Sequence, residues 1–278
     1  MEKYKKRLLL GKGATAWVYL VEEAVSGKRF AMKVSENRTL LQREAEIMCN
    51  LKSKYFPEFV EYLPKEGALV MEYVEGQDLQ TVLNKESKLE PGEVVYIVGE
   101  VLQALDVLHE HTPPMIYRDI KPANIMLGSD GKVCLIDLGT VCLEAEEYGR
   151  AGTYGYGAPE QFWEGARCDR SCDIYSVGKV LAYLLTGRNP AEPPYETQHL
   201  LQGLAGKGTV FRTVLERSLA LSPQARFGMA MEMWRSLQEA YELSLEKHKF
   251  VKRQNPEEST KNAFGKVNIE EYFDFPRK

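Results

Sequence analysis

One polar stretch constrains this chain more than any other. Residues Met115–Leu138 read MIYRDIKPANIMLGSDGKVCLIDL, and their first loop holds Asp119, Lys121 and Asn124. Asp137 follows the next apolar run. A carboxylate can accept a proton, a lysine can neutralise a phosphate, and carboxylate and amide oxygens suit hard metal ions such as Mg²⁺. The stretch therefore indicates phosphoryl transfer, whose transition state is mainly positioned and charge-neutralised.

The spacing of these residues carries more information than any one of them. A polar turn between two strands would explain a single Asp or Asn. The pattern D-x-K-P-x-N, with a D-x-G 13 residues after the Asn, is too particular for a solvated turn. It resembles the catalytic loop and metal-binding turn of serine/threonine protein kinases, and the compact loops and Y-R-D variant look like the bacterial branch of that family.

The resemblance covers residues 4–245 and implies an α+β, bilobal protein kinase fold. We expect a small five-stranded N-lobe with one main helix over residues 1–74 and a larger, mostly helical C-lobe over residues 75–245. Helical patterns near the end of the C-lobe cover residues 197–219 and 229–245. Residues 246–278 lose this periodicity and are predicted to form a C-terminal tail.

A glycine-rich turn lies near the start of the chain. Gly11, Gly13 and Ala16 occur in G-x-G-x-x-A-x-V, which ends at Val18. Glycine lets a backbone approach phosphate oxygens closely, although a plain hairpin turn would explain G-x-G alone. The resemblance implies that Gly11, Gly13 and Val18 cover the nucleotide. The phosphate-binding pattern G-x-x-x-x-G-K-[ST] does not occur in the sequence.

Lys33 lies in the middle of an apolar strand pattern. Strand alternation places Met32 and Val34 on one sheet face, and Ala31 with Lys33 on the other. An edge-strand lysine exposed to water is the plain interpretation of Lys33 alone. The resemblance implies instead that Ala31 and Lys33 contact the nucleotide, and that Glu44 on the following helix pairs with Lys33 and holds it at the α and β phosphates.

The segment MEYVEGQDL resembles the connector between the two kinase lobes. The resemblance implies that the backbone groups of Glu72 and Val74 bind the adenine edge. It also places Met71 at the back of the base pocket and Asp78 near the ribose.

Two long apolar-periodic patterns predict core helices of the C-lobe, over Val94–His111 and Ser171–Thr186. His109 and His111 at the end of the first helix are expected to be cap or surface imidazoles. The resemblance implies that Asp173 in the second helix holds the backbone of the catalytic loop.

The segment after the D-x-G turn also matches the family. Tyr117 stands where the family usually has histidine, and we expect it to pack beneath the turn. Thr153 in G-T-x-x-Y matches the threonine that contacts Asp119 and Lys121.

Two charge pairings are predicted near this segment. The resemblance implies an ion pair between Glu160 of the A-P-E motif and Arg226. In kinases of this family, the arginine before the catalytic Asp often binds a phosphate on the activation loop, and the resemblance implies this role for Arg118. A permanent negative partner for Arg118 is the alternative, and the sequence offers three clustered candidates: Glu144, Glu146 and Glu147.

Composition limits the remaining classes of function. The 278 residues are 44% hydrophobic with a net charge of −4, which suits a globular core and disfavours nucleic acid as the main partner. No run of about 18 apolar residues predicts a membrane span, and the first residues lack a signal-peptide core. Five cysteines without C-x-x-C spacing argue for reduced thiols, and Cys168 and Cys172 have no nearby histidine to complete a metal site. We expect a cytoplasmic protein.

These features together predict an ATP-dependent serine/threonine protein kinase. The resemblance implies that Asp119 is the catalytic base, that Lys121 neutralises the transferring phosphate, and that Asn124 and Asp137 bind Mg²⁺. A pseudokinase that only binds nucleotide or a partner would usually have lost one of these residues or Lys33. A small-molecule kinase of the same fold would seldom carry the A-P-E and G-T-x-x-Y motifs.

Overall fold

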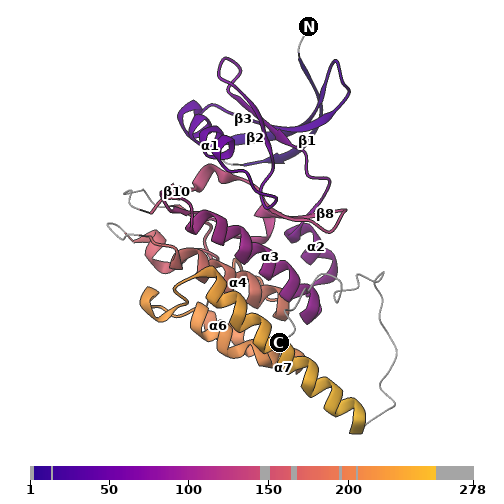
Figure 1. Ribbon diagram of the computed structural model, residues 1–278, viewed down its shortest axis with the longest axis vertical. Coiled ribbons are helices and arrows are strands. Elements are labelled where there is room, and N and C mark those ends of the chain that lie inside the picture. Colours follow the sequence, from indigo (N-terminus) through magenta and orange to yellow (C-terminus); the bar gives the residue numbers. More distant parts are fainter. Residues whose placement is uncertain are drawn as a thin grey trace.

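The computed structural model describes residues 3–13, 15–144, 151–163, 168–193, 196–204 and 206–254. A sheet with one helix lies above a larger group of helices, so the chain folds into two lobes (Figure 1). The predicted bilobal architecture is confirmed.

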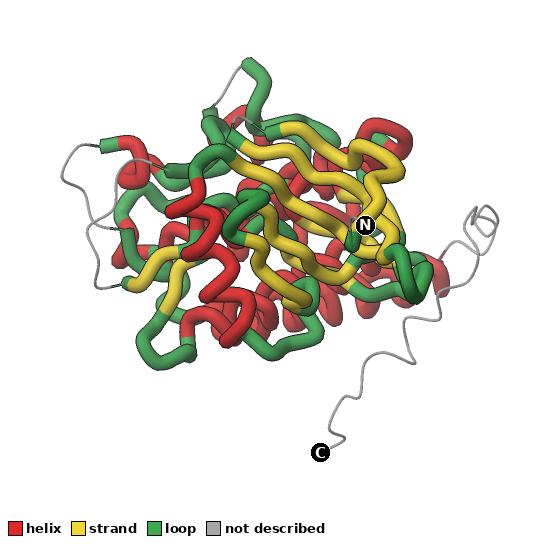
Figure 2. The backbone as a smooth tube through the Cα atoms, turned by 90° about the horizontal axis from the view of Figure 1, so that it is seen from above, coloured by secondary structure: helices red, strands yellow, loops and turns green. Residues whose placement is uncertain are grey.

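The N-lobe is an antiparallel sheet of five strands. Its order is β1-β2-β3-β5-β4, and the strands span Tyr4–Lys12, Ala16–Glu23, Arg29–Ser35, Ala68–Glu72 and Phe59–Leu63 in that order. Side chains alternate across β3 as predicted. Phe30 and Met32 pack into a small core on one face, whereas Ala31 on the other face joins the main core. Seen from above, the sheet lies over the helices of the C-lobe (Figure 2).

Helix α1, Arg38–Asn50, lies beside the sheet and faces the C-lobe. Asn37 caps it, because its side chain accepts a hydrogen bond from the backbone N–H of Leu40 at 3.1 Å. The buried residues of α1 recur at helical spacing and include Leu41, Glu44 and Met48. A glutamate on this buried face needs a cationic partner.

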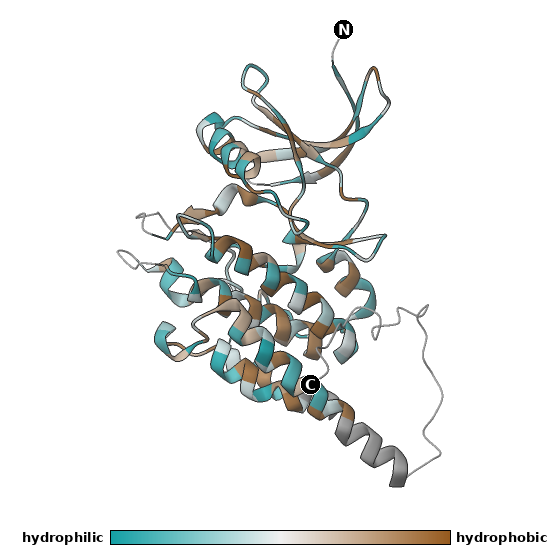
Figure 3. Cartoon of the chain, in the orientation of Figure 1, coloured by the Kyte–Doolittle hydropathy of each residue, from teal (hydrophilic) through white to brown (hydrophobic). Residues whose placement is uncertain are grey.

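The C-lobe is built around α3, Pro91–His109, and α4, Ser171–Thr186. Both helices are rich in hydrophobic residues (Figure 3), and all but the last two residues of α4 are buried. The other helices surround them: α2 (Leu79–Glu86), α5 (Thr197–Gln202), α6 (Arg212–Ser218) and α7 (Ala230–Gln254). Gly99 lets α3 and α7 pack closely, since a Cβ there would lie 2.4 Å from the Trp234 ring.

Short strands and 3₁₀ turns connect these helices, and one of the turns, η2, packs against α1 of the N-lobe. The short strands are β6 (Gly76–Asp78), β7 (Met115–Ile116), β8 (Ile125–Gly128), β9 (Val133–Leu135) and β10 (Cys142–Leu143). The 3₁₀ turns are η1 (Pro122–Asn124), η2 (Leu138–Thr140), η3 (Pro159–Phe162), η4 (Gly206–Phe211) and η5 (Pro223–Ala225). Strands β6, β8 and β9 pair in one small sheet, and β7 pairs with β10.

Two helical predictions differ from the structure. The pattern over residues 197–219 is divided into α5, η4 and α6 rather than one helix. Helix α7 continues to Gln254, nine residues beyond the predicted end at Leu245. Among the described residues, no helix is both long and apolar enough to cross a membrane.

Candidate active site

The predicted catalytic loop, between β7 and β8, brings three polar side chains together. Lys121 Nζ donates to Asp119 Oδ2 at 2.8 Å. The turn η1 places Asn124 over the same carboxylate, and its amide nitrogen donates to Asp119 Oδ2 at 3.1 Å and to the Asp119 carbonyl at 2.9 Å. The three side chains therefore form one cluster, as the sequence predicted.

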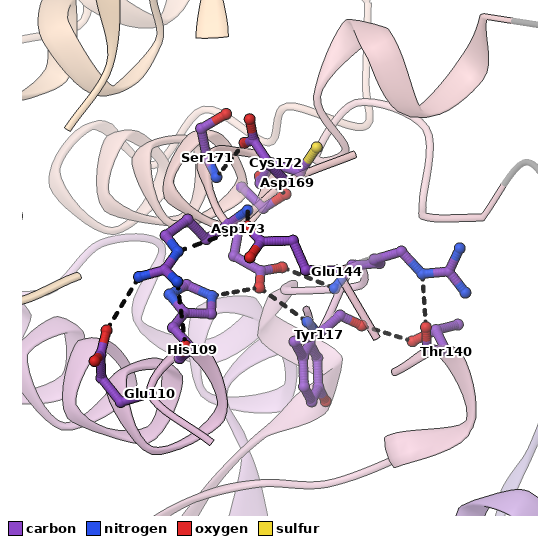
Figure 4. A network of polar contacts seen from close by, with 12 residues as sticks. His109, Glu110, Tyr117, Thr140, Glu144, Asp169, Ser171, Cys172 and Asp173 are labelled. Atoms are coloured by element: carbon purple, nitrogen blue, oxygen red, sulfur yellow. Dashed lines mark hydrogen bonds and ion pairs between the residues drawn. The ribbon is translucent and has the colours of Figure 1, made fainter. Parts of the chain in front are cut away.

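The backbone of this loop is held by Asp173 in α4 (Figure 4). Asp173 is fully buried, and its two carboxylate oxygens accept hydrogen bonds from the backbone N–H groups of Tyr117 at 2.9 Å and Arg118 at 2.7 Å. Arg118 has a φ of +69°, a left-handed conformation that costs energy for a non-glycine residue. The predicted role of Asp173 in holding the catalytic loop is confirmed, and it stabilises this strained residue.

The prediction for His109 was wrong, and Glu144 is not the partner of Arg118. His109 is buried, and its Nε2 lies 2.9 Å from Asp173 Oδ2, because α3 packs against α4 at that point. Glu144 does not pair with Arg118: its carboxylate lies 3.6 Å from Nε of Arg170, which also donates to Glu110 at 3.0 Å (Figure 4). Glu146 and Glu147 lie outside the described residues.

The guanidinium of Arg118 reaches the segment after the D-x-G turn. Its Nε donates to the Thr140 carbonyl at 2.7 Å, and the Thr140 hydroxyl donates to the Tyr117 carbonyl at 3.0 Å. These two hydrogen bonds fix the end of the D-x-G turn against the predicted catalytic loop.

Lys33 lies between two carboxylates. Its Nζ is 2.7 Å from Glu44 Oε2 and 2.6 Å from Asp137 Oδ1, so the predicted ion pair with Glu44 is present. Burial disfavours the Lys33 ammonium, but the charges of Glu44 and Asp137 outweigh burial and raise the lysine pKa. Burial raises the pKa of Glu44. The positive charge of Lys33 lowers it, but by less than burial raises it. For Asp137, the carboxylate is only partly desolvated, and the charge and hydrogen bond of Lys33 outweigh this desolvation and lower its pKa.

The turn that carries Asp137 is tightly built. Asp137 has a φ of +67°, and its Oδ1 accepts from the Gly139 N–H at 3.2 Å. A Cβ at Gly139 would lie 3.1 Å from that oxygen and 3.3 Å from Lys33 Nζ, so a larger residue there would have to displace these side chains slightly. Beneath the turn, the hydroxyl of the fully buried Tyr117 donates to the Ile136 carbonyl. The predicted packing role of Tyr117 is therefore confirmed.

Thr153 completes the cluster from the other side. Its Oγ1 donates to Asp119 Oδ1 and accepts from Lys121 Nζ, both at 2.7 Å. The predicted contact of this threonine with both residues is confirmed.

The predicted ion pair between Glu160 and Arg226 is also present. Glu160 Oε2 accepts a hydrogen bond from Nη2 of the buried Arg226 at 3.0 Å.

The residues predicted to contact a nucleotide lie along the edge of the N-lobe and the connector. Val18 pairs with Lys33 across β2 and β3, and Ala31 pairs with the buried Met71 across β3 and β5. The Gly13 N–H donates to the Ala16 carbonyl at 2.8 Å, which forms the tip of the β1–β2 turn after Gly11.

The connector residues continue from β5 toward the C-lobe. Glu72 ends β5, and Val74 follows between β5 and β6. Asp78 caps α2, because its carboxylate accepts from the Thr81 N–H at 2.9 Å and from the Thr81 hydroxyl at 2.6 Å. Contacts of these residues with adenine and ribose stay predictions.

The donor set at the cluster fits a magnesium ion. The backbone N–H of Ile136 donates to the Asn124 carbonyl at 2.9 Å, which places Asn124 and Asp137 at the same end of the β8–β9 hairpin. The Asn124 amide oxygen and Asp137 Oδ2 accept no hydrogen bond from the described residues, and the Asp137 side chain is 49% exposed. Mg²⁺ typically takes one or two protein oxygens and completes its shell with phosphates and water, so two such donors suffice.

Sequence reasoning missed Gln161, which directly follows Glu160. Its side chain is buried and bonds the backbone of both the catalytic loop and the segment before Thr153. No periodicity or spacing in the sequence marks this glutamine.

Comparison with known proteins agrees with this geometry. The protein kinase domain model matches residues 4–254, up to the last residue of α7. The chain therefore belongs to the protein kinase family.

The chain is similar to both animal and bacterial kinases. Human "Beta-adrenergic receptor kinase 1" is 29% identical over 205 residues, which cover 68% of this chain and 30% of that protein. "G protein-coupled receptor kinase 2" of Caenorhabditis elegans is 30% identical over 206 residues, or 68% of this chain and 29% of the relative. "Serine/threonine-protein kinase PknE" of Mycobacterium tuberculosis is 30% identical over 253 residues, or 81% and 44%. The chain thus spans less than half the length of these relatives.

Proposed function

We propose that this protein transfers the γ-phosphate of ATP to a serine or threonine hydroxyl of a protein, with Mg²⁺ as the metal. The observation that carries the proposal is the Thr153 hydroxyl between Asp119 and Lys121, at 2.7 Å from each. This contact joins the proposed catalytic base to the segment before the A-P-E motif, where a peptide would lie. The name of the relative from Mycobacterium tuberculosis, "Serine/threonine-protein kinase PknE", also supports serine/threonine specificity.

Asp119 has the free acceptor position that the proposed role requires. A carboxylate offers about four lone-pair sites. Lys121 and Asn124 donate to Oδ2, and Thr153 donates to Oδ1. One site on Oδ1 is left for a substrate hydroxyl, so Asp119 can orient that hydroxyl and accept its proton.

The surrounding cations would bind the phosphates. Lys121 stands beside Asp119 and would neutralise the charge of the phosphoryl group in transfer, while Lys33, held by Glu44, would bind the other phosphates. Mg²⁺ held by Asn124 and Asp137 would supply further charge neutralisation when bound. Gly11, Gly13, Val18 and Ala31 would cover the nucleotide, and the backbone of Glu72 and Val74 would bind its base near Asp78. A cytoplasmic location, where ATP is available, is part of the proposal.

Phosphate transfer from labelled ATP in the presence of Mg²⁺ tests this function. The native protein and Asp119→Asn are offered a protein mixture and a set of hydroxylated small molecules in parallel. We expect label on Ser or Thr of proteins, located by mass spectrometry, and at least about a 100-fold loss in the variant.

Two other results would contradict the proposal. Label that appears only on small molecules would indicate a small-molecule kinase of the same fold. Binding of ATP without transfer to any acceptor would indicate a pseudokinase that acts as a nucleotide-binding scaffold.

A further inference from the structure

Gln161 lies at the junction of two backbone segments that meet at the active site. It belongs to η3 and is 3% exposed. Its Oε1 accepts from the Ala158 N–H at 2.7 Å, and its Nε2 donates to the carbonyls of Arg118 at 2.7 Å and Ala151 at 2.9 Å. Both amide hydrogens and the amide oxygen are thus used, so the amide can adopt only one orientation.

Each carbonyl that Gln161 binds directly precedes a functional segment. The Arg118 carbonyl belongs to the peptide bond that leads into Asp119. Arg118 is the left-handed residue whose N–H is held by Asp173 at 2.7 Å, so its two peptide groups are held from opposite sides by Asp173 and Gln161.

On the other segment, the Ala151 carbonyl precedes Gly152 and Thr153. Gly152 has a φ of +129°, and a Cβ there would lie 2.9 Å from Gln161 Nε2, so glycine is required for this contact. Thr153 is the residue whose hydroxyl contacts Asp119. One side chain therefore sets the separation between the backbones that carry Asp119 and Thr153.

We infer that Gln161 is a positioning residue, which aligns the catalytic loop with the Thr153 segment and so sets the orientation of Asp119 toward the substrate hydroxyl. This inference rests on the proposed function. Gln161 is buried, and among the described residues its side chain bonds only backbone groups, so it acts through Asp119 and Thr153 and not through contact with the nucleotide.

Two substitutions separate this role from a general loss of folding. Gln161→Leu keeps the approximate size of the side chain and removes all three hydrogen bonds. We expect kcat for peptide phosphorylation to fall by about 10- to 100-fold, because a small misplacement of a reacting group has an effect of this size. The ATP dissociation constant should stay within about twofold of the native value, because Lys33, Glu44 and Asp137 do not contact Gln161.

Gln161→Glu adds a readout that a purely structural residue would not show. The carboxylate would face two carbonyl oxygens, whereas a protonated carboxyl can donate to one of them. We expect the ratio of variant to native kcat to rise as pH falls from 8 to about 6, because burial and the carbonyls raise the pKa of the introduced carboxyl. Gln103→Leu is the matched control, since Gln103 is a hydrogen-bonded glutamine of α3 outside the site.

Hydrogen exchange gives a test that does not depend on activity. In Gln161→Leu, amides of residues 117–125 and 151–157 should exchange faster together, and amides of α1 should not change. Native kcat and native exchange in this variant would overturn the inference, as would equal losses of ATP binding and kcat. If the native protein transfers no phosphate to proteins, the proposed function fails, and the exchange result alone decides whether Gln161 couples the two segments.

Discussion

Thr153 makes two hydrogen bonds through one hydroxyl, and a pair of substitutions tests the role of that hydroxyl. Its hydroxyl holds Asp119 and Lys121 at 2.7 Å, and the hydroxyl is the group that makes both contacts. Thr153→Ala should lower kcat for peptide phosphorylation by about 10- to 100-fold, because Asp119 loses one of its three side-chain donors and its fixed orientation.

The measurement is steady-state kinetics with a peptide and with ATP varied separately. Thr153→Ser keeps the hydroxyl and serves as the control, with kcat within about threefold of native. The KM for ATP should not change in either variant. An alanine variant with native kcat would show that Asp119 is oriented without Thr153.

The local sequence pattern predicted the residues that form the candidate site. It did not predict the buried residues that hold the backbone of the site in place. Asp119, Lys121 and Asn124 lie within six positions of one another, so the pattern alone brought them together. The supports join distant residues: His109 meets Asp173 64 positions away, and Gln161 meets Arg118 43 positions away. A histidine at a helix end and a glutamine after A-P-E have no local signal of burial, so these contacts depend on how α3, α4 and η3 pack.

At the scale of the elements, apolar period predicted the strands of the N-lobe and helix α4 closely. The apolar period did not predict the end of a helix whose last residues are mostly polar. The residues EKHKFVKRQ at the end of α7 are mostly polar, yet the helix continues through them to Gln254. Between α5 and α6, Gly203, Gly206 and Gly208 interrupt the apolar spacing, and the predicted helical pattern did not take this local signal into account.

Helix α4 also buries a lysine that is not one of the candidate site residues. Lys179 is 3% exposed; its Nζ lies 3.2 Å from the Thr197 hydroxyl and 5.4 Å from the centre of the Tyr175 ring. Burial lowers the pKa of Lys179 from 10.5 to about 8. Between these values the unfolded chain binds more protons than the folded chain, so stability rises with pH across this interval and the charged lysine is a cost below it.

Lys179→Met should therefore stabilise the protein at pH 7. We expect the free energy of unfolding to increase by about 3 kcal/mol, and this gain should fall to roughly half at pH 9.5. Urea unfolding of both proteins at the two pH values measures the difference. An equal gain at both pH values, or a loss at pH 7, would show that the charge of Lys179 is not the source of the effect.

For the whole molecule, Lys33 is a side chain that contacts both lobes at the candidate site. It lies on β3 of the N-lobe, pairs with Glu44 of α1, and contacts Asp137 of the C-lobe at 2.6 Å. Lys33→Met leaves the two carboxylates without their shared cation. We expect phosphate transfer to fall by at least about 100-fold, since the proposed phosphate contact and the alignment of Asp137 are lost together.

The same substitution should loosen the contact between the lobes. Amide hydrogens of α1 and of η2, which pack against each other, should exchange faster in Lys33→Met, while those of β4 and β5 keep native protection. Lys65→Met is the control, because Lys65 is an exposed lysine in the turn between β4 and β5 of the N-lobe. If α1 keeps native protection while transfer is lost, Lys33 acts only on the phosphates, and the packing of α1 on η2 holds the lobes together without it.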